Sequence, residues 1–445
     1  MPLSAQFACD FSTIPLQTLT LINLPAPTGE FGCTAVSESP TLYWQSKDDS
    51  VAYWAIGAAL TVQSNTDVLG VMDTVDQWLV QHPAVRVFGG CMFPTQRPVE
   101  NWPGFYKAQY WVPRLVWAYN TQAQKSVALQ AWVWLESEAQ RGEQLAWFGQ
   151  AVSALSGPAV VKRSVGMTGG QACPNHAEFI HHVQAISQQL VTSDSLEKVV
   201  LARRFDVQFQ TSIEPMAVLQ CLRESEPDAH HICWQIASDT AFMVVSPERL
   251  VYRKGASVIM DAIAGTRPRG DTPERDEQLA NALIHDAKDQ REHAVVLQYN
   301  IDRLNQLCTH VEHDPEYSVL KQHYVQHLYQ RIWGTLRGLT GVNRQLIETV
   351  FPTPAVAGQP LDHALGVIEA REAFSRGLYG GVLGCITPTT SDYVVGIRAL
   401  HQQGASVSIY TGSGLVSGSN PEHEWQEHET KMATVLAPLA SFDAL

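Results

Sequence analysis

The run Tyr410–Lys431 reads YTGSGLVSGSNPEHEWQEHETK, and it predicts a strand, a glycine-rich loop and a helix in direct succession. The residues that lead into it, SVSIY, have the β-branched and aromatic character of a strand. The loop contains three glycines and ends in Ser-Asn-Pro, a combination that favours the start of a helix. Backbone N–H groups in such a loop and at a helix N-terminus can bind an anion.

The predicted helix adds charged side chains beside this loop. Glu424, Glu427 and Lys431 are spaced i, i+3 and i+7, so they lie on one side of the helix. Two carboxylates and a lysine next to backbone amides suit a metal-assisted site for a carboxylated small molecule.

The composition of the whole chain narrows the class of protein. Its 445 residues are 45% hydrophobic and 17% charged, which fits a folded globular protein, and a net charge of −14 argues against nucleic acid or an anionic membrane as the main partner. Eight cysteines without a C-x-x-C pair predict reduced thiols, not a zinc or disulfide framework. Neither a signal-peptide pattern nor a run of about 20 apolar residues is present, so we expect a cytoplasmic protein.

The composition and pattern of the sequence differ between residues 1–170 and residues 171–445, which we expect to form one compact unit. The first part is rich in tryptophan and alternates strand-like segments, such as VRVFGGCMF and YWVPRLVWAY, with turn signals. The Gly89-Gly90 pair inside a strand pattern indicates a bulge or a close approach of another backbone. Residues 156–175 are rich in glycine, proline and small residues and are predicted to be a connection.

The second part, expected to be catalytic, mixes helices and strands. A helix is predicted in HAEFIHHVQAISQQLV, followed by strands joined by short turns through AGT at residues 264–266. A long helix from about Thr272 to Cys308, broken once, precedes further strands and the final helix. A meander of this kind favours an antiparallel sheet, so the predicted class is α+β, antiparallel sheets with helices packed outside.

Glu292 is a candidate ligand on the long predicted helix. It lies about 180° from the centre of the apolar stripe Leu297–Cys308, on a side that it shares with Val296 and Tyr299. The helix is therefore apolar on two faces, which favours a buried Glu292 over a solvated one, although a surface charge is the alternative. Together with the carboxylate pair of the last helix, it is a candidate oxygen ligand for Mg²⁺.

Two further residues are candidates for acid–base chemistry. Lys198 opens the strand-like run EKVVLARR on the apolar face of Val200, where lost hydration lowers the pKa of a lysine toward that of a general base. The alternative is a strand-end lysine whose ammonium reaches water. Glu248, in SPERL, follows a proline at a strand junction and can project into a cleft, or it is a turn residue paired with Arg249.

Arginines and glycines supply candidate anion-binding groups. The segment AGTRPRG combines two arginines with two glycines after a strand, and Arg398 ends the strand-like run DYVVGIR. Guanidinium forks and exposed N–H groups suit carboxylate binding. The GSGLVSG segment lacks the spacing of a dinucleotide fingerprint, and the chain has no Walker motif, but these amides can still bind a carboxylate.

Taken together, these runs resemble the chorismate-utilising enzyme family, which includes isochorismate, salicylate, anthranilate and aminodeoxychorismate synthases. The matching pieces occur in the family's order over roughly residues 197–435: EKVVLARR, SPERL, AGTRPRG, REH, FPTPAVAGQP, RGLYGGVLG, GIRAL and GSGLVSGSNPEHEWQEHETK. The resemblance implies one two-layered α+β fold, with sheets stacked centrally, helices outside and a single cleft.

The resemblance also implies a site for chorismate. Mg²⁺ is held by Glu292, Glu424 and Glu427 and bridges to the ring carboxylate. The lysine matching Lys198 activates water for attack at C2, and the glutamate matching Glu248 protonates the departing C4 hydroxyl. The implied substrate-binding residues are Gly265, Thr266, Ala355, Arg398, Tyr410, Gly412, Ser413, Gly414 and Lys431.

Departures from related patterns point to water as the nucleophile. Anthranilate-type members carry a glutamine in place of Lys198 and take ammonia from a partner amidotransferase, and aminodeoxychorismate synthases usually have a lysine where this chain has Ala264. We therefore expect a Mg²⁺-dependent isochorismate synthase that acts on chorismate without an amidotransferase partner.

Other functions stay open at this point. Salicylate synthases share the lysine and tend to carry a threonine where Ala355 aligns, so a salicylate synthase is the main alternative. An amine-transferring relative or a non-catalytic chorismate-binding protein is less favoured. The tryptophan-rich first part and the overall length favour a menaquinone-type enzyme over a siderophore-type one.

Overall fold

The computed structural model describes residues 15, 18–24, 40–98, 101–155, 165–192 and 195–440. The strands are β1 Thr20–Leu24, β2 Thr41–Gln45, β3 Val51–Ser64, β4 Val87–Cys91, β5 Ala108–Asn120, β6 Lys125–Val133, β7 Met167–Cys173, β8 Lys198–Phe209, β9 His230–Ala237, β10 Thr240–Ser246, β11 Arg249–Lys254, β12 Ser257–Pro268, β13 Cys308–His313, β14 Ser318–Lys321, β15 Val325–Leu336, β16 Gly358–Gln359, β17 Val382–Ile386, β18 Thr390–Val395, β19 Ala399–Gln403 and β20 Ser406–Val416. The helices are α2 Val68–Gln81, α3 Gln140–Leu155, α4 His176–Thr192, α5 Pro215–Ser225, α6 Pro273–His285, α7 Ala287–Leu307, α8 Val342–Val350, α9 Leu361–Arg371 and α10 Pro421–Ala440.

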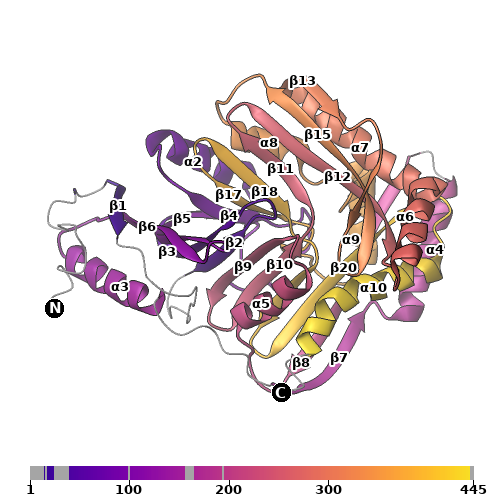
Figure 1. The fold of residues 1–445 in the computed structure, drawn as a ribbon, viewed down its shortest axis with the longest axis horizontal. Coiled ribbons are helices and arrows are strands. Elements are labelled where there is room, and N and C mark those ends of the chain that lie inside the picture. The colour runs from indigo at the N-terminus through magenta and orange to yellow at the C-terminus, as the bar shows by residue number, and fades with distance from the viewer. Residues whose placement is uncertain are drawn as a thin grey trace.

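The strands form extended antiparallel arrays with helices on their outer faces (Figure 1). One series of pairs runs β7–β8–β20–β19–β10–β9–β2–β3–β5–β6–β1. A second leaves β5 and runs β4–β17–β18–β11–β12–β15. Strands before residue 170 therefore pair directly with later strands, and the predicted α+β class is confirmed.

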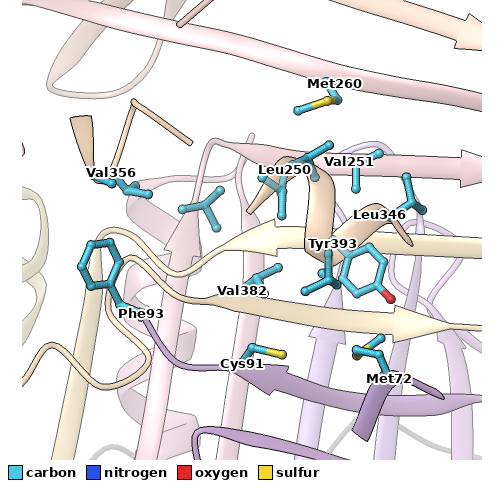
Figure 2. Packing of buried hydrophobic residues seen from close by; sticks show 14 of the residues in the cluster. Met72, Cys91, Phe93, Leu250, Val251, Met260, Leu346, Val356, Val382 and Tyr393 are labelled. Atoms are coloured by element: carbon cyan, nitrogen blue, oxygen red, sulfur yellow. The ribbon is translucent and has the colours of Figure 1, made fainter. Parts of the chain in front are cut away.

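The core that supports this arrangement is built from the inward faces of several strands and helices. Figure 2 shows buried side chains from β4, β11, β12, β17 and α8 gathered in one cluster, among them Cys91, Val251, Met260, Val382 and Leu346. Each is fully or almost fully removed from solvent. Burial of these apolar groups, at about 25 cal/mol per Å², is the main force that fixes the strands relative to one another.

The predicted break in the long helix is confirmed at Asp286. This residue ends α6 and caps α7, since its side chain accepts hydrogen bonds from the backbone N–H groups of Lys288 and Asp289. The cap sets the rotation of α7, which turns Glu292 toward the interior, where it is 8% exposed. The prediction that Glu292 is not simply solvated is therefore confirmed.

The predicted helix at the start of the second part is also confirmed, as α4. Its apolar positions at helical spacing are buried: Phe179, Val183, Ile186 and Leu190.

Two predictions about the connections were wrong. Residues 156–175 are not simply a connection, because β7 forms an edge strand along β8 and main-chain pairing overrides the weak strand propensity of its two glycines; residues 156–164 lie outside the described part. The strands of the second part are not all joined by short turns, since α5 lies between β8 and β9. Pro215 starts α5, and its face with Leu219 and Leu222 is buried.

The Gly89-Gly90 pair marks a close backbone approach and not a bulge. A Cβ at Gly89 would lie 2.1 Å from the carbonyl oxygen of Gln109, and one at Gly90 would lie 2.6 Å from that of Val382. The register with both neighbouring strands is unbroken at these positions. Glycine therefore lets β4 pack against its surroundings.

Two further predictions concern thiols and membranes. The cysteines within the described residues, Cys91, Cys173, Cys221, Cys233, Cys308 and Cys385, are free thiols; Cys9 and Cys33 lie outside this part. Among the helices described here, none combines the length and apolar character needed to cross a membrane.

Candidate active site

A cleft lies where the start of β8 meets the ends of β12 and β20. It contains about 800 Å³ of empty space, counting the part open to solvent. Most of the residues predicted from the sequence line it: Lys198, Glu248, Gly265, Thr266, Glu292, Ala355, Arg398, Tyr410, Gly412, Gly414 and Lys431. Segments separated by more than 200 residues thus meet in one place.

Lys198 and Glu292 form an ion pair inside the cleft. The Lys198 side chain is 1% exposed, and its Nζ lies 3.2 Å from Glu292 Oε1. Burial alone would raise the pKa of Glu292, but the positive charges of Lys198, Lys288 and Lys431 outweigh it and hold this pKa below its ordinary value. Glu292 is therefore an anion whose charge is balanced by lysines.

The glycines beside this pair belong to a strand. We predicted an anion-binding loop at Gly412–Gly414, but β20 continues through Val416 and pairs with β8 along this stretch, because main-chain pairing with β8 extends to Lys198. A Cβ at Gly414 would lie 2.2 Å from Glu292 Oε1 and 2.8 Å from Lys198 Cε. The glycine thus leaves room for two functional side chains against the strand.

Glu248 lies between β10 and β11 and is 4% exposed. Burial, and then the negative charge of Asp261, raise the pKa of this carboxyl to about 8, although Lys198, Lys47 and Lys431 oppose the rise. Glu248 is therefore protonated at neutral pH and can act as an acid. The alternative of a turn residue paired with its neighbour is wrong, because Arg249 pairs with Asp48 and Asp392 instead.

Asp261 and Lys47 form an ion pair next to Glu248. Lys47 Nζ lies 2.7 Å from Asp261 Oδ2 and donates a 2.9 Å hydrogen bond to the carbonyl oxygen of Pro247, next to Glu248. Tyr329 donates a hydrogen bond to the other oxygen of Asp261. This network ties the segment before Glu248 to β12 and keeps a negative charge close to the acid.

Arg398 differs from its predicted position at a strand end. It lies in the turn between β18 and β19 with φ of 47°, a left-handed conformation that redirects its side chain. Its guanidinium lies 3.3 Å from Glu226 Oε1 and bonds to Gln322 and to Nε2 of His327 at 3.1 Å. A buried guanidinium at the cleft wall suits a carboxylate ligand.

Lys431 reaches the cleft from α10. Its Nζ lies 2.7 Å from Glu427 Oε1 and donates a 2.9 Å hydrogen bond to the carbonyl oxygen of Gly412. Tyr410 completes this wall, where its ring stacks on Tyr379 with centroids 5.2 Å apart. One cation and two aromatic rings therefore enclose this end of the cleft.

Three predicted residues do not line the cleft. Ser413 alternates to the opposite side of β20 from its two glycine neighbours, and its buried Oγ has no hydrogen-bond partner. Glu427 reaches the cleft only through Lys431. Glu424 is 1% exposed and lies 2.7 Å from Lys288 Nζ through its Oε1.

Glu292, Glu424 and Glu427 are the residues that could hold a metal ion. Within the described ranges, no three His, Cys, Asp or Glu side chains are grouped closely enough to hold one. Burial and then the charge of Glu427 nevertheless raise the pKa of Glu424, Glu292 adds to this effect, and Glu424 Oε2 has no hydrogen-bond partner. Hard carboxylate oxygens that repel one another in this way fit Mg²⁺, provided that their lysine partners give way.

Comparisons with known proteins show the family to which the chain belongs. The family model described as chorismate binding enzyme matches residues 22–440. The chain belongs to this family. Its solved relative MenF, the menaquinone-specific isochorismate synthase from Escherichia coli, has a TM-score of 0.82 and 27% identity, with 95% of each chain covered.

Sequence relatives extend to plants. Isochorismate synthase 2 of Arabidopsis thaliana is 32% identical over 378 residues, which cover 82% of this chain and 66% of that protein. Isochorismate synthase of Catharanthus roseus is 40% identical over 237 residues, or 53% of this chain and 41% of that protein. The chain thus spans less than two thirds of the length of these two plant relatives.

This member of the chorismate-binding enzymes also has cleft residues that the sequence analysis did not single out. Arg376 donates hydrogen bonds of 2.7 Å to the carbonyl oxygens of Val356 and Val200 and so fixes one wall. His327 lines the cleft, where burial and then the charge of Arg398 hold its pKa well below the ordinary value and keep it neutral. The run RGLYGG was noted as a piece of the pattern, but only the structure shows that its arginine fixes the cleft.

Proposed function

We propose that this protein is an isochorismate synthase, which converts chorismate to isochorismate. The observation that carries the proposal is the meeting of Lys198 and Glu248 in one enclosed cleft of a chorismate-binding enzyme. One is a buried amine and the other a carboxyl that is protonated at neutral pH. Water addition at C2 with loss of the C4 hydroxyl needs one base and one acid.

Lys198 is the proposed base. Once its ion pair with Glu292 is released, its amine takes a proton from a water molecule whose oxygen forms the new bond to C2 of the ring. Gly414 allows Lys198 and Glu292 to share this space, since a methyl group there would overlap both side chains.

Glu248 is the proposed acid. As the ring double bonds shift, the bond from C4 to its hydroxyl breaks, and the Glu248 carboxyl gives the proton that lets this group leave as water. One water enters and one leaves, so the product is an isomer of the substrate. Burial and then the negative charge of Asp261 keep the proton on Glu248 until that step, because both raise the pKa of the acid.

Positive groups hold the two substrate carboxylates. Arg398, in the turn between β18 and β19, and Lys431, on α10, both line the cleft. Their positive charges offset, within the cleft, the net charge of −14 on the whole chain. Glu292, Glu424 and Glu427 are the proposed holders of Mg²⁺, which when bound neutralises the ring carboxylate as charge shifts through the ring. The Lys198 position supports water and not ammonia as the nucleophile, so no amidotransferase partner is required.

The place of the product in metabolism is a finer part of the proposal. The match to MenF, with a TM-score of 0.82 and 27% identity, supports a menaquinone-type role. The salicylate biosynthesis isochorismate synthase of Pseudomonas aeruginosa is 28% identical over 436 residues, so formation of isochorismate in this family serves more than one route.

The test is product identification after incubation of the purified protein with chorismate and MgCl₂. We expect isochorismate to accumulate, and we expect Lys198→Ala and Glu248→Gln to form none while they keep the fold. Salicylate with pyruvate, or turnover that requires ammonia or glutamine, would assign a different activity. Near-full isochorismate formation by either variant would remove the proposed roles.

A further inference from the structure

Helix α7 begins with a lysine that the helix itself does not favour. Lys288 lies in the first turn, where the partial positive charge of the helix N-terminus disfavours a cation. Its ammonium instead lies 2.7 Å from Glu424 Oε1 on α10. This ion pair joins the two helices that carry the proposed metal ligands.

Lys288 is held less firmly than the other lysines that pair with these carboxylates. The Lys198 side chain is only 1% exposed, and Lys431 has a second acceptor in the carbonyl oxygen of Gly412. The Lys288 side chain is 26% exposed, so its ammonium can turn to solvent by rotation about its own bonds. It is the cation of this set that is free to move.

Glu424 is stabilised by a positive partner while it is ionised. It is 1% exposed, and one of its oxygens bonds to Lys288 while the other has no hydrogen-bond partner. Leaving a buried carboxylate without a counter-charge is strongly destabilising. While Glu424 is ionised, a cation that binds to it can take the place of Lys288.

We propose that Lys288 is a displaceable counter-ion, which neutralises Glu424 in the metal-free enzyme and turns out to solvent when Mg²⁺ binds. The inference rests on the proposed function, in that it takes Glu292, Glu424 and Glu427 as the metal ligands. It adds that Mg²⁺ must compete with an internal ammonium, so Lys288 sets the metal concentration at which the site fills.

The test compares Lys288→Met with the wild type by calorimetric titration of MgCl₂ into EDTA-treated, substrate-free protein. Removal of the competing charge is expected to lower the dissociation constant for Mg²⁺ by roughly tenfold. Lys288→Arg keeps the charge and is expected to bind Mg²⁺ no more tightly than the wild type. Lys321→Met is the matched control, because Lys321 also pairs with a buried carboxylate, that of Asp276, but lies outside the site; the affinity of this variant for Mg²⁺ is expected to be unchanged.

Thermal unfolding supplies a second readout. Without Mg²⁺, Lys288→Met is expected to melt below the wild type, and saturating MgCl₂ is expected to close that gap. An equal loss of stability with and without Mg²⁺, or an unchanged or weaker affinity, would mean that Lys288 is only a structural tie between α7 and α10. A variant too unstable to titrate is replaced by Lys288→Gln, to which the same expectations apply.

These outcomes are separate from those of the proposed function. Isochorismate formation by the wild type, together with no gain of affinity in Lys288→Met, overturns the inference alone. Tighter Mg²⁺ binding in a protein that does not convert chorismate supports the counter-ion and overturns the proposed activity.

Discussion

Replacement of Glu248 by glutamine should make the protein more stable at high pH while it abolishes turnover. Burial and the nearby charge of Asp261 raise the pKa of this carboxyl from 4.5 to about 8. In the unfolded chain the group ionises at its ordinary pKa, so between these two values the folded state holds a proton that the unfolded state has lost. The stability of the wild type must therefore fall as the pH rises through this window.

The magnitude follows from the size of that window. Each pH unit is worth about 1.36 kcal/mol, so ionisation of Glu248 costs the folded protein on the order of 5 kcal/mol by pH 9 and almost nothing near pH 4.5. Glutamine has nearly the same shape and cannot ionise. Glu248→Gln is thus expected to exceed the wild type by no more than about 1 kcal/mol at pH 5 and by several kcal/mol at pH 9.

Urea unfolding followed by tryptophan fluorescence measures this difference at the two pH values, in EDTA. Glu348→Gln is the control, since Glu348 is 51% exposed and lies on α8, away from the cleft. This substitution should change the free energy of unfolding by the same amount at pH 5 and pH 9. If the free energies of unfolding of Glu248→Gln and the wild type differ by the same amount at pH 5 and pH 9, Glu248 ionises as an ordinary surface acid. That result would contradict a raised pKa for Glu248 in the folded protein.

Two other substitutions test the cleft. Gly414→Ala places a methyl group on Glu292 and Lys198 and should lower kcat/KM by roughly ten- to a hundredfold, whereas Gly338→Ala, which has open space around it, should not. Asp261→Asn removes the charge that, after burial, does most to raise the pKa of Glu248. The loss of activity at high pH should then begin roughly one pH unit lower, as a pH–rate profile would show, and an unmoved profile would exclude this role for Asp261.

Local patterns predicted the elements of the fold better than their contacts. The apolar spacing of α4, the single break in the long helix and the strand character of β8 are properties of neighbouring residues, so they could be read from the sequence. The edge strand β7 could not, because its pairing with β8 depends on a partner that starts 25 residues further along and not on its own glycine-rich composition.

The site shows the same limit. The residue types of Lys198, Glu248 and Glu292 indicated their chemistry, and the resemblance to the family indicated that they meet. The lysine partners of the carboxylates were not foreseen, since the pairing of Lys288 with Glu424 joins two helices more than 130 residues apart. The left-handed backbone at Arg398 was also hidden, because a non-glycine residue gives no local signal for it.

In the proposed reaction Lys198 activates a water molecule, whose oxygen forms the new bond to C2 of chorismate. An oxygen-labelling experiment follows that oxygen directly. The wild type is incubated with chorismate and MgCl₂ in H₂¹⁸O, and the product is isolated and examined by mass spectrometry and NMR. We expect isochorismate with one ¹⁸O in the C2 hydroxyl from the wild type, and no labelled product from Lys198→Ala. Isochorismate without the label, or labelled product from Lys198→Ala at the wild-type rate, would contradict the proposed reaction.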